Sequence, residues 1–256
     1  MEHHFLDQYS DRDSLIHRLD PRVKAITFFS LVLFVILTPA ASFSAFGFYG
    51  ALLIILIAFS KVPPIFVVRR SLVIIPFVVI VGLFMPFIKG GRSLGNYSLG
   101  AVDFSVTYEG VMLFWNIFIK AMLSCISLTV LTSTTRFVDL LKGFETMHLP
   151  KLLIMILSFM YRYIYVFIGE LMSMRIAKES RSAGGGKRFH LKAIANMVGV
   201  FFIRAYERGE RVYLAMCSRG FDGTVRTLNR LKLNARDIYF SFSVIALLIT
   251  IRCFAK

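Results

Sequence analysis

The sequence predicts an all-α, polytopic membrane protein with N-terminal transmembrane helices, long cytoplasmic helices and a C-terminal transmembrane helix. Of its 256 residues, 57% are hydrophobic and 18% are charged, whereas soluble domains are about 45–50% apolar and about 25% charged. The mean hydropathy is +0.69. The 36 residues Ala25–Ser60 contain no charged side chain, and a helix needs about 20 apolar residues to cross the bilayer. These observations exclude an ordinary soluble enzyme.

The first two spans are expected within that uncharged run. Asp20 is a typical helix N-cap and Pro21 fits the first helical turn, so the first helix should begin there. The run is too long for one helix, and Thr38–Ser42, which contains Pro39, should break it. We expect a helical hairpin that turns on the outer face. The polar stretch before Ala25 lacks the pattern of a secretory signal peptide.

The third span is expected at Ser71–Ile88, 18 uncharged residues that include Pro76 and Pro86. Because proline frees a backbone carbonyl, we expect this helix to be kinked and supported by its neighbours. The polar, glycine-rich stretch Lys89–Asp103 that follows is expected to be an exposed loop.

The fourth span is expected at Gly110–Thr135, where Lys120 is the one charged residue among 26. An ionisable group inside a span can mark a functional site. The long lysine stem can also carry the ammonium to polar surroundings, and we expect this simpler role of local pairing for Lys120.

Positive charge divides the chain into three regions. Residues 1–135 form the N-terminal transmembrane region of about four spans, residues 136–236 a cytoplasmic region, and residues 237–256 a C-terminal transmembrane helix. The middle region holds 18 Lys and Arg against 7 Asp and Glu, a net of +11. Cytoplasmic segments of membrane proteins carry an excess of Lys and Arg. The N-terminus and the middle region are therefore expected on the cytoplasmic side of the cell membrane.

Three helices are expected in the cytoplasmic region. The first, Phe137–Met147, has apolar residues on one face and Asp139 on the opposite, polar face. The second runs from Lys151 to about Ser182, and its apolar first half leaves open whether residues 151–170 form a true span. The third runs from about Leu191 to Ser218, with Arg and Glu residues spaced for ion pairs along its surface.

The two longer helices each end in an arginine flanked by small residues. The two sets are Ser180, Arg181 and Ser182, and Ser218, Arg219 and Gly220. A guanidinium there can offset the negative end of its own helix. It can also present a fork of donors to carboxylates or carbonyls of a partner, and small neighbours let that partner approach. The repetition of the arrangement favours two docking sites for a cytoplasmic protein.

Catalytic, cofactor and metal sites are not expected. Gly186 and Lys187 do not form a P-loop, because Arg181 and Arg188 stand where that motif requires Gly and Ser or Thr. The three cysteines lie far apart and lack zinc-site spacing. The His3–His4 pair lies near the N-terminus, where we expect a solvated tail.

Several stretches resemble the transmembrane T component of energy-coupling factor (ECF) transporters, and most closely its cobalt-type branch, which is also known for nickel. They are His17–Lys24, Val106–Gly110, Thr134–Leu141, Met160–Tyr163 and, as the most specific, Arg204–Tyr213 with Ala215–Gly223. The resemblance covers nearly the whole chain.

The resemblance implies a non-catalytic subunit of an ATP-driven importer. Two Ala-Arg-Gly-like motifs of the family dock into paired ABC ATPases, which are two subunits or a homodimer of one. Arg181 and Arg219 match the central residues of these motifs. Ser180 and Ser218 stand where the family has Ala, and Ser182 stands where it has Gly. The helices would transmit ATPase movements to a membrane substrate-binding component.

Three alternatives stay open or are disfavoured. Substrate selectivity should reside in another subunit, so the sequence of this chain does not separate cobalt from nickel. For the same reason, a T component that serves vitamin-type binding subunits is possible. A self-contained secondary carrier would show repeated halves and polar midplane groups, and Lys120 is the one candidate. Nucleic-acid binding is not expected, because most aromatic residues lie in apolar helix halves rather than among the basic ones.

Overall fold

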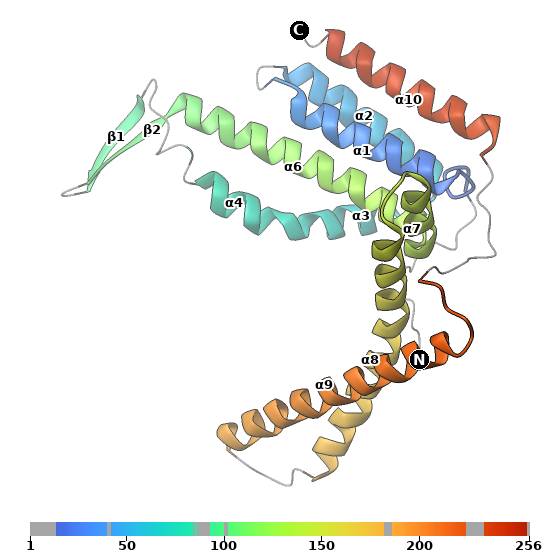
Figure 1. Cartoon of the computed structure of the whole chain (residues 1–256). Coiled ribbons are helices and arrows are strands. Elements are labelled where there is room, and N and C mark those ends of the chain that lie inside the picture. Colours follow the sequence, from blue (N-terminus) through green and yellow to red (C-terminus); the bar gives the residue numbers. More distant parts are fainter. Residues whose placement is uncertain are drawn as a thin grey trace. The chain divides into compact units, whose positions relative to one another are not determined.

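The computed structural model describes residues 14–39, 42–83, 85, 93–99, 102–181, 186–223 and 233–254 (Figure 1). The chain divides into two compact units. We call residues 4–143 and 231–256 the bundle unit, and residues 144–230, with residues 1–3, the crossed-helix unit. Each unit is described on its own.

The bundle unit opens with the expected helical hairpin. Helix α1 covers Pro21–Leu37 and helix α2 covers Phe43–Ser60. The Asp20 carboxylate accepts a hydrogen bond from the backbone N–H of Arg22 at 2.9 Å, and this caps α1 as predicted.

The third apolar stretch begins earlier than predicted. Helix α3 covers Pro64–Ser71, a 3-10 turn η1 covers Leu72–Ile74, and α4 covers Ile75–Leu83. Arg69 and Arg70 lie in the last turn of α3, where cations suit the negative end of the helix. Pro76 lies in the first turn of α4, where a missing N–H breaks no helical hydrogen bond. A 3-10 turn thus interrupts the α-helix just before Pro76. The expected kink stays a prediction, and Pro86 lies outside the described residues.

The segment after α4 holds a β-hairpin where a loop was expected. Strand β1, Ser93–Leu99, pairs antiparallel with strand β2, Val102–Thr107, with an irregular register between Ser93 and Gly95. Apolar and polar residues alternate from Val102 to Thr107, a period typical of strands, and the glycine content obscured it. Helix α6, Tyr108–Thr134, follows directly and confirms the fourth predicted helix.

The core of the bundle unit lies among α1, α2, α6 and α10, the last covering Ala235–Phe254. Helices α1 and α2 each pack against both α6 and α10. Side chains with almost no exposed surface fill the interior, and they include Phe28, Leu31, Val35, Tyr49, Leu53, Val130 and Leu248. At 20 residues, α10 is longer than the apolar run of 14 in the sequence, since it takes in charged residues at both ends.

The crossed-helix unit consists mainly of two long helices. Helix α7, Phe137–Thr146, contains the boundary between the units. Helix α8 covers Lys151–Arg181 as predicted, and α9 covers Lys187–Cys217, starting four residues earlier than predicted. Within the described chain, α2, α6, α8 and α10 are long and apolar enough to cross a bilayer. The all-α polytopic membrane fold is therefore confirmed, with one small hairpin added.

Candidate functional site

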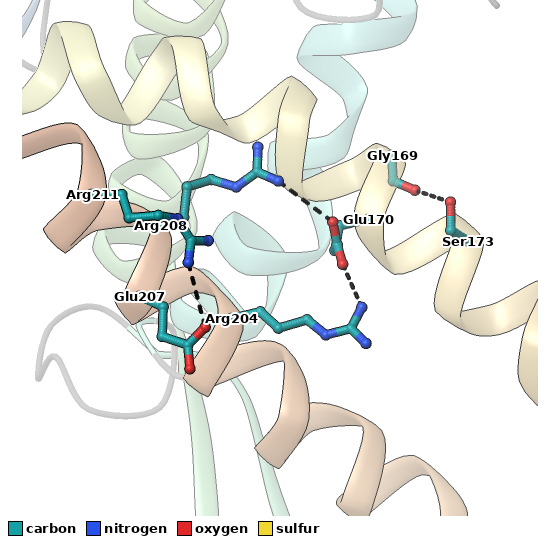
Figure 2. Close-up of polar contacts among 7 residues, drawn as sticks. All are labelled: Gly169, Glu170, Ser173, Arg204, Glu207, Arg208 and Arg211. Carbon is teal, nitrogen blue, oxygen red and sulfur yellow. Dashed lines mark hydrogen bonds and ion pairs between the residues drawn. The ribbon is translucent and has the colours of Figure 1, made fainter. Parts of the chain in front are cut away.

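The two long helices of the crossed-helix unit are joined by an ion-pair cluster where they cross (Figure 1). The Glu170 carboxylate of α8 receives the Arg204 guanidinium of α9 at 2.7 Å and that of Arg208 at 3.7 Å. Figure 2 shows both arginines reaching from α9 toward this one acidic side chain. A lone exposed pair contributes only about 0–1 kcal/mol, but a shared carboxylate forms a network. The cluster fixes which turns of α8 and α9 meet.

These interhelical pairs extend the sequence prediction of ion pairs along the surface of α9. Arg211 pairs with Glu207 of the same helix at 3.7 Å, as predicted. Arg204 and Arg208 pair across to α8 instead. Because sequence spacing shows only which residues share a helix face, it could not reveal that Glu170 lies opposite them.

Two grooves lie between the helices. The first, of about 410 Å³, is formed by the second half of α8 and the first half of α9, and it combines the cations of Lys178, Arg181 and Arg204 with apolar side chains. The second, of about 480 Å³, is formed by the first half of α8 and the second half of α9, and its lining is mostly apolar and aromatic, including Phe159, Met216 and Phe221. The grooves thus lie on opposite sides of the crossing. We call the parts of α8 and α9 on each side of the crossing its two arms.

Arg181 ends α8 and its side chain is exposed at the first groove. The neighbouring Ser180 hydroxyl donates to the Ile176 carbonyl at 2.9 Å, so this small side chain folds back on its own helix. That leaves the guanidinium as the projecting group. Ser182, the third predicted residue of this set, lies outside the described residues.

Arg219 lies in a well-defined helix-ending turn. The Phe221 N–H donates to the Met216 carbonyl at 3.1 Å and the Gly220 N–H to the Cys217 carbonyl at 3.0 Å. This pair of bonds is a Schellman motif, and Gly220 has the left-handed backbone it requires, with φ +77°. The turn presents the exposed Arg219 at a fixed place.

The two arginines are not brought into a single site. At 1.5 Å of rise per residue, Arg181 lies about 16 Å along α8 from Glu170, and Arg219 lies about 22 Å along α9 from Arg204. Each arginine ends a different arm of the crossing. The arrangement suits contact with two separate protein surfaces.

Lys24 is a buried charged residue that sequence reasoning missed. Its ammonium donates to the backbone carbonyls of His17 and Thr134, each at 3.0 Å, and its side chain is 2% exposed. The Asp139 carboxylate acts on it electrostatically. Asp139 is half-buried rather than on a fully solvated helix face. Both residues looked like ordinary charges at a membrane boundary, so no sequence signal distinguished them.

Lys120 has the local role that was predicted for it. Its ammonium donates to the carbonyls of Ile36 at 2.9 Å and Thr38 at 2.7 Å. These carbonyls belong to the end of α1, where helical partners are lacking. Among the described residues, no group of three or more His, Cys, Asp or Glu side chains could hold a metal ion; His3 and His4 lie outside them.

Comparison with known proteins identifies the family. A family model described as "Cobalt transport protein", CbiQ, matches residues 12–229. The chain belongs to the CbiQ family. It is an ECF-type transmembrane component, as the resemblance of its motifs indicated.

Two relatives of this CbiQ family member align with nearly its full length, and a third aligns with about half of it. An energy-coupling factor transporter transmembrane protein EcfT of Clostridium kluyveri is 29% identical over 94% of this chain and 93% of its own. An uncharacterized protein of Methanocaldococcus jannaschii is 26% identical over 95% of this chain and 84% of its own. A putative fused cobalt transport protein CbiMQ of Methanocorpusculum labreanum is 31% identical over 52% of this chain, which spans 22% of that longer protein.

Proposed function

We propose that this chain is the energy-coupling membrane subunit of an ECF-type ABC importer for cobalt or nickel. Arg181 and Arg219 dock on two ABC ATPase subunits, or on a homodimer of one, and a separate membrane component binds the ion. The N-terminus and residues 136–236, which carry a net charge of +11, face the cytoplasm. The chain itself does not hydrolyse ATP.

The observation that carries this proposal is the pair of exposed arginines at the ends of two helices that cross. One motif on each arm allows two ATPases to hold the crossed-helix unit at once. A guanidinium offers a fixed fork of donors to carboxylates or free helix-end carbonyls. Small flanking residues, among them Ser180 and Gly220, let a groove close around each arginine.

Movement of the ATPases would then act on α8 and α9, which the Glu170 cluster holds together. Because Glu170 bonds to Arg204 and Arg208 at the crossing, a displacement at either end of α8 or α9 turns the two helices together. The mostly apolar second groove lies on the arm that ends in Arg219. Movement of the ATPases would thus displace Arg181 and Arg219, then the crossing of α8 and α9, and finally the rest of the chain.

The direct test is capture of the ATPase by the purified chain. We expect Arg219→Ala to reduce capture by about tenfold or more, because a lost charge-assisted contact costs about 1.5–3 kcal/mol. Arg211→Ala is the matched control, since Arg211 is an exposed arginine of α9 that pairs within its own helix. Arg204 is unsuitable as a control, because it forms the crossing.

The outcome has a clear reading. Loss of capture in Arg219→Ala and in Arg181→Ala, with normal capture in Arg211→Ala, supports the docking assignment. Equal capture by all variants contradicts it. Copurification with a vitamin-type binding component instead of an ion-type one would keep the coupling role and reassign the substrate class.

A further inference from the structure

Lys24 lies at a junction of segments in the bundle unit. Its ammonium binds the carbonyl of His17, which precedes α1, and the carbonyl of Thr134, which ends α6. Burying an ammonium is costly unless it is hydrogen-bonded and paired with opposite charge. The residue therefore ties two elements together, and its burial requires carboxylates nearby.

Three carboxylates supply that charge, and they come from three different segments. Asp139 of α7, Asp20 before α1 and Asp237 of α10 each favour the positive charge of the Lys24 ammonium electrostatically. Asp20 and Asp237 are buried. The Asp237 carboxylate also accepts the N–H of Asn234 at 3.0 Å, which fixes the start of α10.

Two of these carboxylates lie on the connections between the two units. The chain leaves the bundle unit between Gly143 and Phe144 and returns between residues 230 and 231. Asp139 lies in α7, four residues before the chain leaves the bundle unit. Asp237 lies in the first turn of α10, soon after the chain returns to it. Each connection thus has, close to the point where it meets the bundle unit, a carboxylate that acts electrostatically on the same ammonium.

Both connecting helices are also packed on α1 at this end. A side-chain carbon added to Gly143 of α7 would lie 3.5 Å from the backbone nitrogen of Arg22, so α7 lies against the start of α1. Helix α10 packs along α1, and the Thr27 hydroxyl donates to that of Ser241 at 3.3 Å.

We propose that Lys24 is a positioning residue that anchors both chain connections to α1 and α6. A displacement of the crossed-helix unit would then move the bundle unit, because Lys24 holds both connections against α1 and α6. Without Lys24, the two connections could move while the bundle unit stays in place. This proposal rests on the coupling function proposed above, and it adds the residue through which the coupling enters the membrane.

Lys120 provides a matched control for Lys24. It is a second lysine of the bundle unit whose ammonium donates to two backbone carbonyls, those of Ile36 and Thr38. Among the residues that the structure describes, no carboxylate acts on its ammonium. Lys120→Met therefore removes a comparable pair of hydrogen bonds and leaves the connections untouched.

The first experiment measures amide hydrogen exchange of the full-length chain in lipid nanodiscs. We expect Lys24→Met to speed exchange by roughly tenfold or more both in α7 and in the first turns of α10, because a charged donor is lost. Lys120→Met should speed exchange at the end of α1 and leave α7 and α10 unchanged. Unchanged exchange in α7 and α10 of folded Lys24→Met would overturn the proposal.

Two milder variants keep the test decisive if Lys24→Met does not fold. Asp139→Asn and Asp237→Asn preserve side-chain size and remove one charge each. Each should loosen its own helix, and Lys24→Arg, which keeps the positive charge, should loosen neither as much as Lys24→Met. Normal exchange in both Asn variants would overturn the shared anchor.

The second experiment measures ⁵⁷Co²⁺ uptake per ATP hydrolysed by the complete transporter in liposomes. Asp139→Asn should lower this ratio severalfold while ATP hydrolysis persists, because the ATPases still move but their movement reaches the bundle poorly. Glu145→Gln, a neutralised carboxylate on the same helix, should leave the ratio unchanged. An unchanged ratio in Asp139→Asn overturns the proposal. Failure of the wild-type transporter to take up the ion contradicts the proposed substrate instead, and the anchor is then tested by the hydrogen-exchange experiment.

Discussion

Gly220 shows how a single residue can set the position of a functional neighbour. Its left-handed backbone, with φ +77°, closes the Schellman turn that holds Arg219. A residue with a Cβ loses roughly 1–2 kcal/mol in that conformation. The position of the Arg219 guanidinium thus depends on Gly220, although glycine has no side chain that could contact a partner protein.

We therefore expect Gly220→Ala to weaken ATPase capture although every arginine is retained. The turn would open or shift, and capture should fall by about fivefold or more in a pull-down. Gly199→Ala is the matched control, since Gly199 lies inside α9 with open space around it and alanine favours a helix interior. Normal capture by Gly220→Ala would show that the turn does not position Arg219.

Single residues also mark the limit of sequence reasoning. Asp20, Pro21 and Gly220 were predictable because helix ends use a small set of residue types with local geometry. Lys24 and Glu170 were not, because their partners are distant along the chain: the hydrogen bond from Lys24 to Thr134 spans 110 residues. Burial of a charge depends on tertiary structure, which local patterns do not record.

At the scale of elements, the crossing of α8 and α9 is the feature on which the proposed transmission of ATPase movement depends. The carboxylate of Glu170 bonds to two guanidiniums of α9 (Figure 2). Removing its charge leaves Arg204 and Arg208 without this partner. The docking arginines at the helix ends are unaffected by that change.

We expect Glu170→Gln to separate docking from transport. ATPase capture should stay normal, while ion uptake by the complete transporter falls severalfold because α8 and α9 turn independently. Glu179→Gln is the control, since Glu179 pairs with Arg175 on the surface of α8 alone. Uptake by Glu170→Gln equal to that of Glu179→Gln would show that the cluster does not brace the crossing.

Element boundaries were predicted best where breakers and caps are strong. The start of α1 follows from Asp20, and the break between α1 and α2 follows from Pro39. The start of α3 at Pro64 was not predicted, because Arg69 and Arg70 lie inside this helix and bound the uncharged run that begins at Ser71. The β1–β2 hairpin was missed because its glycines suggested a loop, although alternation from Val102 to Thr107 indicated a strand.

At the scale of the whole molecule, composition alone identified a membrane protein, because 57% hydrophobic residues and a 36-residue uncharged run leave few other solutions. Charge composition also separated residues 136–236 from the transmembrane regions. The proposed role of the crossed-helix unit in ATPase docking is supported by its two exposed arginines, which end different helices.

The central claim is that this chain transmits work done by other subunits and transports no ion by itself. Its most direct test is ⁵⁷Co²⁺ uptake into ATP-loaded and ATP-free liposomes that hold either the chain alone or the complete transporter. We predict uptake only for the complete transporter with ATP, and its loss when Arg181 and Arg219 are both changed to Ala. Saturable uptake by liposomes that hold this chain alone would contradict the account.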